Sequence, residues 1–172
     1  MRFFWKCVAY FALIGAIAHF VGLLLSRHRF EPRRAPWRPA KWEKDGHFWE
    51  QTLRVRRWMN RLPDMSRIMP DMQPKRLVGK ATPRKVEVLI RETCVAELVH
   101  WLLVLFGFEC VTIWPGTGGW VISLLYALGN LPFIIIQRYN RPKFVRLHTW
   151  LCEKDGCDKA SSACHGEEVK GV

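Results

Sequence analysis

Three long apolar runs constrain this chain of 172 residues more than any other feature of its sequence. They cover residues 3–25, 95–114 and 120–136. An α-helix rises about 1.5 Å per residue, so about 20 apolar residues cross the ~30 Å hydrocarbon core of a bilayer. The sequence therefore predicts an all-α membrane protein with about three transmembrane helices.

The first run is expected to be an N-terminal transmembrane anchor over residues 1–25. A cleaved signal peptide is the alternative, because Arg2 and Lys6 resemble a basic leader segment. However, the apolar stretch over residues 7–25 is longer than the usual ~7 to 15 residues of a signal peptide, and no A-x-A cleavage site follows it. These two features favour an uncleaved anchor.

Most of the positive charge lies between the first and second apolar runs. Residues 26–93 hold 18 Lys and Arg against 8 Asp and Glu, which accounts for +10 of the total net charge of +12. A basic segment beside a membrane is expected to meet anionic lipid. Because the chain has no RNP-type motif, zinc-finger spacing or Gly-rich phosphate loop, nucleic acid is not an expected partner.

Within this basic segment, residues 48–61 are predicted to form an interfacial amphipathic helix. Aromatic and leucine side chains recur there at spacings of about three or four residues, with arginines between them. Pro63 is expected to end this helix, and a further helix is expected to begin near Pro83 or Arg84, since proline is favoured in a first helical turn.

Residues 94–147 are predicted to form a transmembrane helical hairpin, with "PGTGG" at 115–119 as its turn. Basic residues are dense at 27–91 and 138–146, whereas the turn has none. The positive-inside rule then predicts a multi-pass protein of the cell membrane whose basic segment and C-terminus are cytoplasmic.

Residues 148–172 are predicted to be a polar flexible tail. Cys152, Cys157, Cys164 and His165 lie there. Their spacing lacks a C-x-x-C pair, so free thiols are expected rather than a zinc site.

Two ionisable residues in the second apolar run are candidates for catalysis. Glu97 and His100 are three residues apart and share one face of a helix. A carboxylate that holds one nitrogen of an imidazole leaves the other nitrogen to accept a proton, as a general base does. The alternatives are that both side chains snorkel to the interface, or that E-x-x-H binds a di-metal centre. The other apolar runs lack the further carboxylates that a di-metal centre needs, so no metal is expected.

Three stretches carry a resemblance to a known family: "EKDGHFWEQTLRVRRWMNRLPD" at 43–64, "RETCVAELVHW" at 91–101 and "NLPFIIIQRYNRPKFVRL" at 130–147. In block order and spacing the chain resembles the glycosyl-4,4'-diaponeurosporenoate acyltransferases of staphyloxanthin-type carotenoid biosynthesis. The resemblance implies a membrane enzyme whose partners are a fatty acyl donor and a glycosylated lipid acceptor. It would transfer the acyl chain to a sugar hydroxyl, without a cofactor.

The roles expected on this hypothesis are specific. His100 acts as the base and Glu97 orients it, while arginines bind the donor's phosphate or the developing oxyanion. The expected substrate-binding residues are Arg56, Trp58, Gln137, Arg138, Tyr139, Asn140 and Arg141. The alternative function is a non-catalytic membrane protein that binds anionic lipid or scaffolds a lipid-pathway complex. A scaffold requires the basic charge but not Glu97 together with His100.

Overall fold

The computed structural model describes residues 1–62 and 81–155, and within these residues all regular secondary structure is helical. Three long helices dominate: α1 (Arg2–Leu24), α4 (Pro83–Gly107) and α6 (Thr117–Asp155). Shorter elements are η1 (Arg27–Arg29), η2 (Lys41–Gly46), α2 (His47–Leu53), α3 (Val55–Trp58), η3 (Met59–Arg61) and α5 (Cys110–Ile113).

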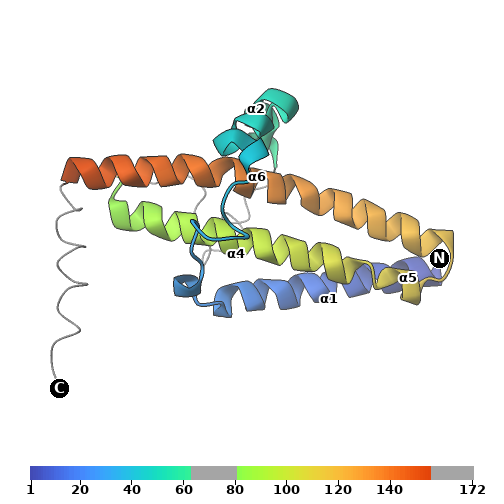
Figure 1. Cartoon of the computed structure of the whole chain (residues 1–172). Coiled ribbons are helices and arrows are strands. Elements are labelled where there is room, and N and C mark those ends of the chain that lie inside the picture. The colour runs from blue at the N-terminus through green and yellow to red at the C-terminus, as the bar shows by residue number, and fades with distance from the viewer. Residues whose placement is uncertain (63–80, 156–172) are drawn as a thin grey trace, which may run out of the picture.

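The long helices lie side by side, with α4 running opposite to α1 and α6 (Figure 1). The contact between α4 and α6 is the most extensive in the molecule, and η2 and α2 pack on α6 near its middle. All three long helical segments are long and apolar enough to cross a membrane. The predicted all-α fold with three such helices is confirmed.

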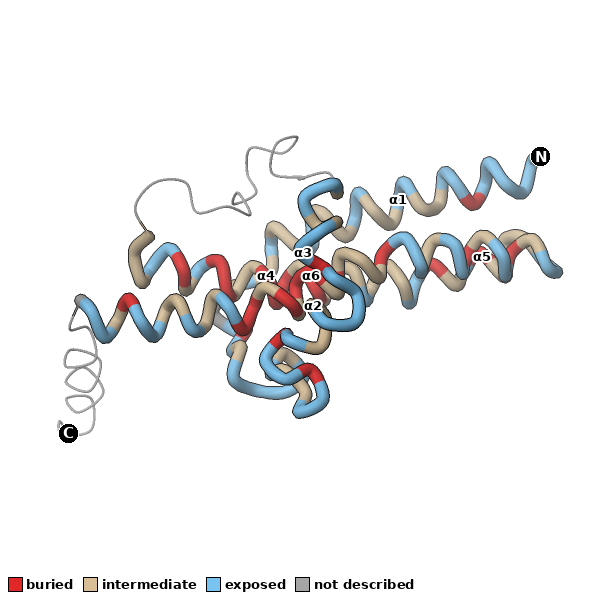
Figure 2. Tube along the Cα trace, turned by 90° about the horizontal axis from the view of Figure 1, so that it is seen from above, coloured by how far each residue is buried: buried red, intermediate tan, exposed pale blue. Residues whose placement is uncertain are grey.

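Many residues of these helices are exposed (Figure 2), and large apolar side chains are frequent among them. Phe20 on α1, Leu105 on α4 and Leu125 on α6 are each more than 60% exposed. Such surface is unfavourable in water but is what a helix presents to lipid, where no hydrophobic force drives side chains inward.

Helix α1 packs on the hairpin rather than standing apart as an anchor. Tyr10 Oη donates a hydrogen bond to the carbonyl of Phe106 at 3.0 Å, and the ring of Phe11 stacks on Tyr126 with centroids 3.9 Å apart. At the other end of α1, Arg27 pairs with Glu92 of α4 at 3.0 Å. The first apolar run is therefore part of the bundle.

The hairpin is tightly joined. Helix α4 ends at Gly107, where the neighbouring ring of Tyr126 leaves no room for a Cβ atom, and Ser123 Oγ donates to the Gly107 carbonyl at 3.1 Å. Short helix α5 follows, and Gly116 takes a left-handed φ of 92° before α6 begins. The predicted turn at 115–119 is thus confirmed in place, although α6 starts within it at Thr117.

The predicted start of α4 is also confirmed. Pro83 occupies the first turn, and Thr82 caps it by accepting a hydrogen bond from the Lys85 backbone N–H at 3.4 Å. A side-chain cap satisfies one of the amide groups that a helix start leaves unpaired, and proline has no such group to satisfy.

Helix α6 is much longer than the predicted third span. Its 39 residues correspond to about 58 Å, almost twice the ~30 Å hydrocarbon core. It continues through Pro132 and Pro142 and covers residues 148–155, so the prediction of a flexible tail is wrong for that stretch. Leu151 packs there against Val86 and Ile90 of α4, which stabilises the extension. The remaining predicted tail, residues 156–172 with Cys157, Cys164 and His165, lies outside the described residues.

The single amphipathic helix predicted over residues 48–61 is wrong in its continuity. Arg54 has a left-handed backbone (φ 48°, ψ 46°) that separates α2 from α3. The break lets Val55 insert against Ile136 and Tyr139 of α6, where it is fully buried. Packing on α6 therefore overrides the helical periodicity of this segment.

Candidate functional site

Four charged side chains meet where the apolar halves of α4 and α6 end: Glu43 of η2, Glu97 of α4, and Arg138 and Arg141 of α6. Arg138 donates to Glu43 through Nε (2.5 Å) and Nη2 (3.2 Å), and to Glu97 Oε1 through Nη1 (2.7 Å). Arg141 Nη2 donates to the other oxygen of Glu97 at 2.5 Å. We call this set the ion network.

Arg141 has its hydrogen-bonding capacity almost filled by the protein. Its Nε donates to Thr93 Oγ1 (2.9 Å), its Nη1 to the Trp37 carbonyl (2.8 Å), and its Nη2 to the Thr93 carbonyl (3.0 Å) as well as to Glu97. The side chain is 2% exposed. Arg141 thus joins α4, α6 and the loop before η2, and little of it is presented to a ligand.

The ion network carries two negative and two positive charges, so it is neutral as a unit. Taking a charge out of water costs several kcal/mol unless it is paired and fully hydrogen-bonded. Glu43 and Glu97 are 1% and 2% exposed, and each accepts hydrogen bonds on both oxygens. This arrangement answers how the second apolar run tolerates Glu97: two arginines compensate its charge.

His100 lies one helical turn further along α4 and has a different partner from the one expected. Its Nδ1 and Asn130 Oδ1 are 2.9 Å apart, and its ring stacks on Phe133 with centroids 4.8 Å apart. In the structure Glu97 is hydrogen-bonded to two arginines and His100 Nδ1 contacts Asn130. The expectation that Glu97 orients the imidazole stays a prediction.

The Asn130 amide determines which nitrogen of His100 carries the proton. Asn130 Nδ2 donates to the Tyr126 carbonyl at 2.9 Å, and this fixes Oδ1 as the atom that faces the histidine. A carbonyl oxygen can only accept, so neutral His100 must carry its hydrogen on Nδ1 and its lone pair on Nε2. These two hydrogen bonds, from Asn130 to the Tyr126 carbonyl and from His100 to Asn130, thus select the His100 tautomer in which Nε2 has the lone pair that can accept a proton.

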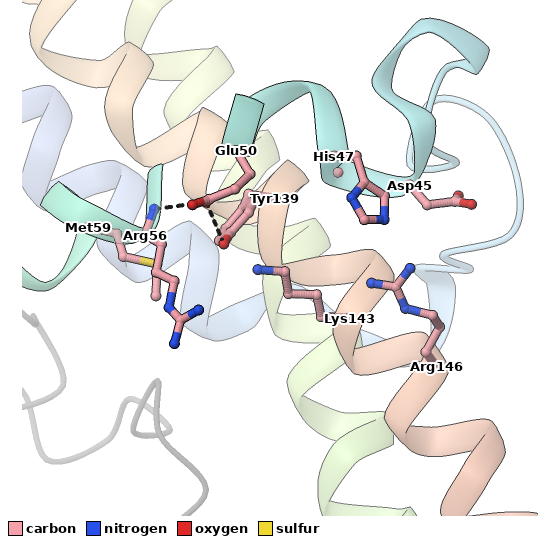
Figure 3. A pocket seen from close by; sticks show the side chains of 9 residues that line it. Asp45, His47, Glu50, Arg56, Met59, Tyr139, Lys143 and Arg146 are labelled. Carbon is pink, nitrogen blue, oxygen red and sulfur yellow. Dashed lines mark hydrogen bonds between the residues drawn. The ribbon is translucent and has the colours of Figure 1, made fainter. Parts of the chain in front are cut away.

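An open pocket of about 300 Å³ whose lining residues are mostly ionisable lies beside the ion network, between α6 and the η2–η3 segment (Figure 3). Glu50 lies at one side of it and accepts hydrogen bonds from Tyr139 Oη (2.8 Å) and the Arg56 backbone N–H (3.2 Å). The full lining is Asp45, Gly46, His47, Glu50, Arg56, Met59, Tyr139, Lys143 and Arg146.

The hydrogen bond from Tyr139 lowers the pKa of the Glu50 carboxyl below its ordinary value of 4.5, and the backbone hydrogen bond from Arg56 adds to the lowering. Glu50 is therefore ionised at neutral pH. It serves as a fixed acceptor that holds the α2–α3 segment against α6.

Two strained backbone stretches border this pocket. Lys44, Asp45 and Gly46 have consecutive positive φ values of 46°, 53° and 90°, and Arg54 has a φ of 48°. Left-handed geometry at residues other than glycine costs of order 1 to 3 kcal/mol and is concentrated at functional sites. Gly46 has an added reason for its identity, since a Cβ atom there would lie 3.1 Å from the Tyr139 carbonyl.

The remaining predicted site residues fall in different surroundings. Tyr139 and exposed Arg56 line the pocket, whereas Gln137 is buried and Asn140 is half-buried on α6. Trp58 packs against the Val55, Ile136 and Tyr139 cluster, and its Nε1 donates to the Leu53 carbonyl at 2.9 Å.

Several residues of the site escaped sequence reasoning. Glu43 and Thr93 are members or partners of the ion network, and Glu50 anchors the pocket. Asn130 was noticeable as an amide inside an apolar run, which is a signal of a buried hydrogen bond. For Glu43 and Glu50 no such signal exists, because both lie in a highly charged segment.

Comparison with known proteins gives one consistent result. A family model described as glycosyl-4,4'-diaponeurosporenoate acyltransferase matches residues 26–149, which include the ion network, His100, Asn130 and the pocket. Proteins of that name from Staphylococcus aureus strains N315, bovine RF122 and USA300 are each 28% identical to the chain over 144 residues. The alignments cover 82% of this chain and 85% of each relative. No solved structure matches the chain.

Proposed function

The chain belongs to the glycosyl-4,4'-diaponeurosporenoate acyltransferase family, and we propose that it transfers a fatty acyl chain to a sugar hydroxyl of a glycosylated lipid at a membrane surface. The name of the relatives specifies a glycosylated carotenoid acid as their acceptor. We propose an acceptor of the same chemistry here, with a sugar head attached to a long apolar body.

The observation that carries the proposal is the hydrogen-bonded chain from the Tyr126 carbonyl through Asn130 to His100. It supports His100 Nε2 as the general base. In the proposed reaction the sugar hydroxyl oxygen attacks the acyl carbonyl carbon as Nε2 takes the hydroxyl proton. The bond between the acyl carbon and the donor's leaving group then breaks, and the leaving group receives that proton.

Asn130 replaces Glu97 as the proposed orienting residue. Glu97 is assigned a supporting role, because its pairing with Arg138 and Arg141 fixes the relative position of α4 and α6 and therefore of His100 and Asn130. Arg141 is too enclosed to bind a donor, so the proposed binding residues are those that line the open pocket.

The placement of these groups is compatible with a lipid acceptor. His100 lies about one turn inside the ion network, towards the apolar part of the bundle, where an acyl carbonyl and a sugar head on a membrane-dissolved lipid both occur. We further propose that the part of the bundle that contains the ion network lies on the cytoplasmic side of the membrane, as the distribution of Lys and Arg favours.

The test is acyl transfer by purified, detergent-solubilised protein to a glycosylated carotenoid acceptor. His100→Ala and His100→Gln are each expected to lower turnover by ~10²- to 10⁴-fold, since a positioned base contributes a factor of that size. His19→Gln is the matched control, because it removes a half-buried histidine from α1 instead.

Asn130→Ala should lower turnover less than His100→Ala, because the imidazole remains but loses its preferred tautomer. Near-normal rates for both His100 variants would contradict the proposed mechanism. Absence of acyl transfer by the purified unmodified protein, together with binding of anionic lipid that depends on its basic residues, would favour the alternative of a lipid-binding scaffold.

A further inference from the structure

The pocket beside the ion network continues into a second pocket of about 410 Å³. Asp45 and Arg146 line both pockets, which therefore adjoin each other on α6, and we call the two together the basic trough. The second pocket is lined by Pro32, Arg33, Arg38, Pro39, Asp45, Arg141, Pro142, Val145 and Arg146.

The basic trough is strongly cationic. Five exposed cations line it: Arg33, Arg38, Arg56, Lys143 and Arg146. Only Asp45 and Glu50 oppose them, since the charge of Arg141 is already compensated by Glu97. The lining therefore has an excess of three positive charges, whereas the adjacent ion network is neutral.

These cations have few protein partners. Within residues 1–62 and 81–155, none of the four arginine side chains takes part in an ion pair, and Lys143 Nζ lies 3.2 Å from the centre of the Tyr139 ring. An anion with several oxygens would supply the acceptors that these guanidinium groups lack. Arginine's planar fork suits phosphate in particular.

The position of the trough relative to His100 indicates what the anion belongs to. Tyr139, on the trough, is nine residues beyond Asn130 on α6, which is about 13 Å along the helix axis. A phosphate in the trough is therefore too far from His100 to react there itself. A donor that carries its acyl ester on an extended arm, some distance from its phosphates, spans this separation.

We propose that the basic trough binds the phosphate groups of the acyl donor, and that Lys143, Arg146 and Arg56 are its principal anchors. This inference rests on the proposed acyltransferase function and deepens it by assigning the donor a phosphate-bearing head. A soluble acyl thioester of coenzyme A carries its acyl group on a long arm away from its phosphates and so fits this separation. A membrane phospholipid shares the phosphate but not the long arm, and it is the alternative that the test distinguishes.

The test uses the full chain in nanodiscs of neutral lipid and compares Lys143→Gln/Arg146→Gln with the unmodified protein. Coenzyme A is the soluble probe, measured by equilibrium dialysis, and phosphatidylglycerol vesicles are the lipid probe, measured by fluorescence transfer. Loss of two charged hydrogen-bond donors should weaken binding of the true probe by about tenfold or more. Added salt should weaken it too, because the cations are exposed.

Arg84→Gln/Lys85→Gln is the matched control, because it removes two exposed cations at the start of α4, outside the trough. Selective loss of coenzyme A binding in the trough variant supports a thioester donor, and selective loss of vesicle binding supports a phospholipid donor. Equal binding of both probes by the two double variants overturns the inference.

Failure of the inference and failure of the proposed function are distinguishable. If the trough variant keeps the donor's KM while His100→Gln loses turnover, the trough assignment is wrong and the function stands. If neither histidine variant affects acyl transfer but probe binding still depends on Lys143 and Arg146, the function as proposed is wrong and the trough remains an anion site.

Discussion

Replacing Arg141 by Met separates a structural role of this arginine from the ligand-binding role predicted from the sequence. The side chain is 2% exposed, and its four hydrogen bonds all go to groups of the protein. Met has a similar length but no donor. Arg141→Met therefore removes the link from α6 to Thr93 and Trp37 and leaves Glu97 with Arg138 as its one remaining arginine partner.

The loss of stability expected for Arg141→Met follows from the burial of Glu97, whose carboxylate loses one of its arginine partners. Breaking a buried ion pair by removing one side typically costs about 3 to 5 kcal/mol, because the other charge stays buried. At about 2 to 4 °C per kcal/mol for a chain of this size, the melting temperature should fall by roughly 10 °C. Arg146→Met, at an exposed site on the same helix, should change stability by no more than about 0.5 kcal/mol.

The assay is thermal unfolding in one detergent, followed by circular dichroism at 222 nm, with the donor's KM measured well below the melting temperature. Arg141→Met should lower the melting temperature with little change in KM, and Arg146→Met should do the reverse. Glu97→Leu combined with Arg141→Met should be less destabilising than the sum of the two single changes, because the double variant removes both charges of the buried ion pair and leaves neither without its partner. Equal melting temperatures for Arg141→Met and Arg146→Met would refute the reasoning.

Three further predictions concern other parts of the fold. Gly46→Ala should destabilise the protein by about 1 to 3 kcal/mol, since Gly46 has a φ of 90° and its new Cβ would press on the Tyr139 carbonyl; chemical denaturation measures this. Ionised Glu50 should contribute stability above pH 4.5 that is lost as the pH falls through its lowered pKa. Tyr139→Phe should diminish that acid-range dependence in melting curves recorded from pH 3 to 7. In intact cells, a cysteine placed at Gly118 of a cysteine-free variant should react with an impermeant maleimide, and one at Arg57 should not; the opposite pattern would invert the proposed topology.

The elements that were predictable are those specified by local sequence. The long apolar runs gave the three long helices, and Pro83 with a capping residue before it marked the start of α4. Length and composition suffice there because a membrane-crossing helix must satisfy its backbone hydrogen bonds within itself.

The elements that were missed depend on contacts between distant segments. Glu97 and His100 share a helix face, as predicted, but spacing does not reveal that Arg138 and Arg141 lie 41 and 44 residues away on the facing helix. An arginine with a hydrogen-bonding fork is a better partner for a buried carboxylate than a neighbouring imidazole. The break at Arg54 has the same origin, because burial of Val55 against α6 outweighs one strained residue.

The basic stretch "QRYNRPKFVR" at 137–146 combines two kinds of cation that composition cannot tell apart. A helix turns about 100° per residue, so Tyr139, Lys143 and Arg146 fall within about 60° of one another, roughly 140° from the direction of Arg138 and Arg141. One face of α6 therefore contributes arginines that are neutralised inside the protein, and another contributes cations that remain open. Because Glu43 and Glu97 neutralise the buried arginines while Lys143 and Arg146 stay exposed, stability and donor binding should respond to different cations of the same motif.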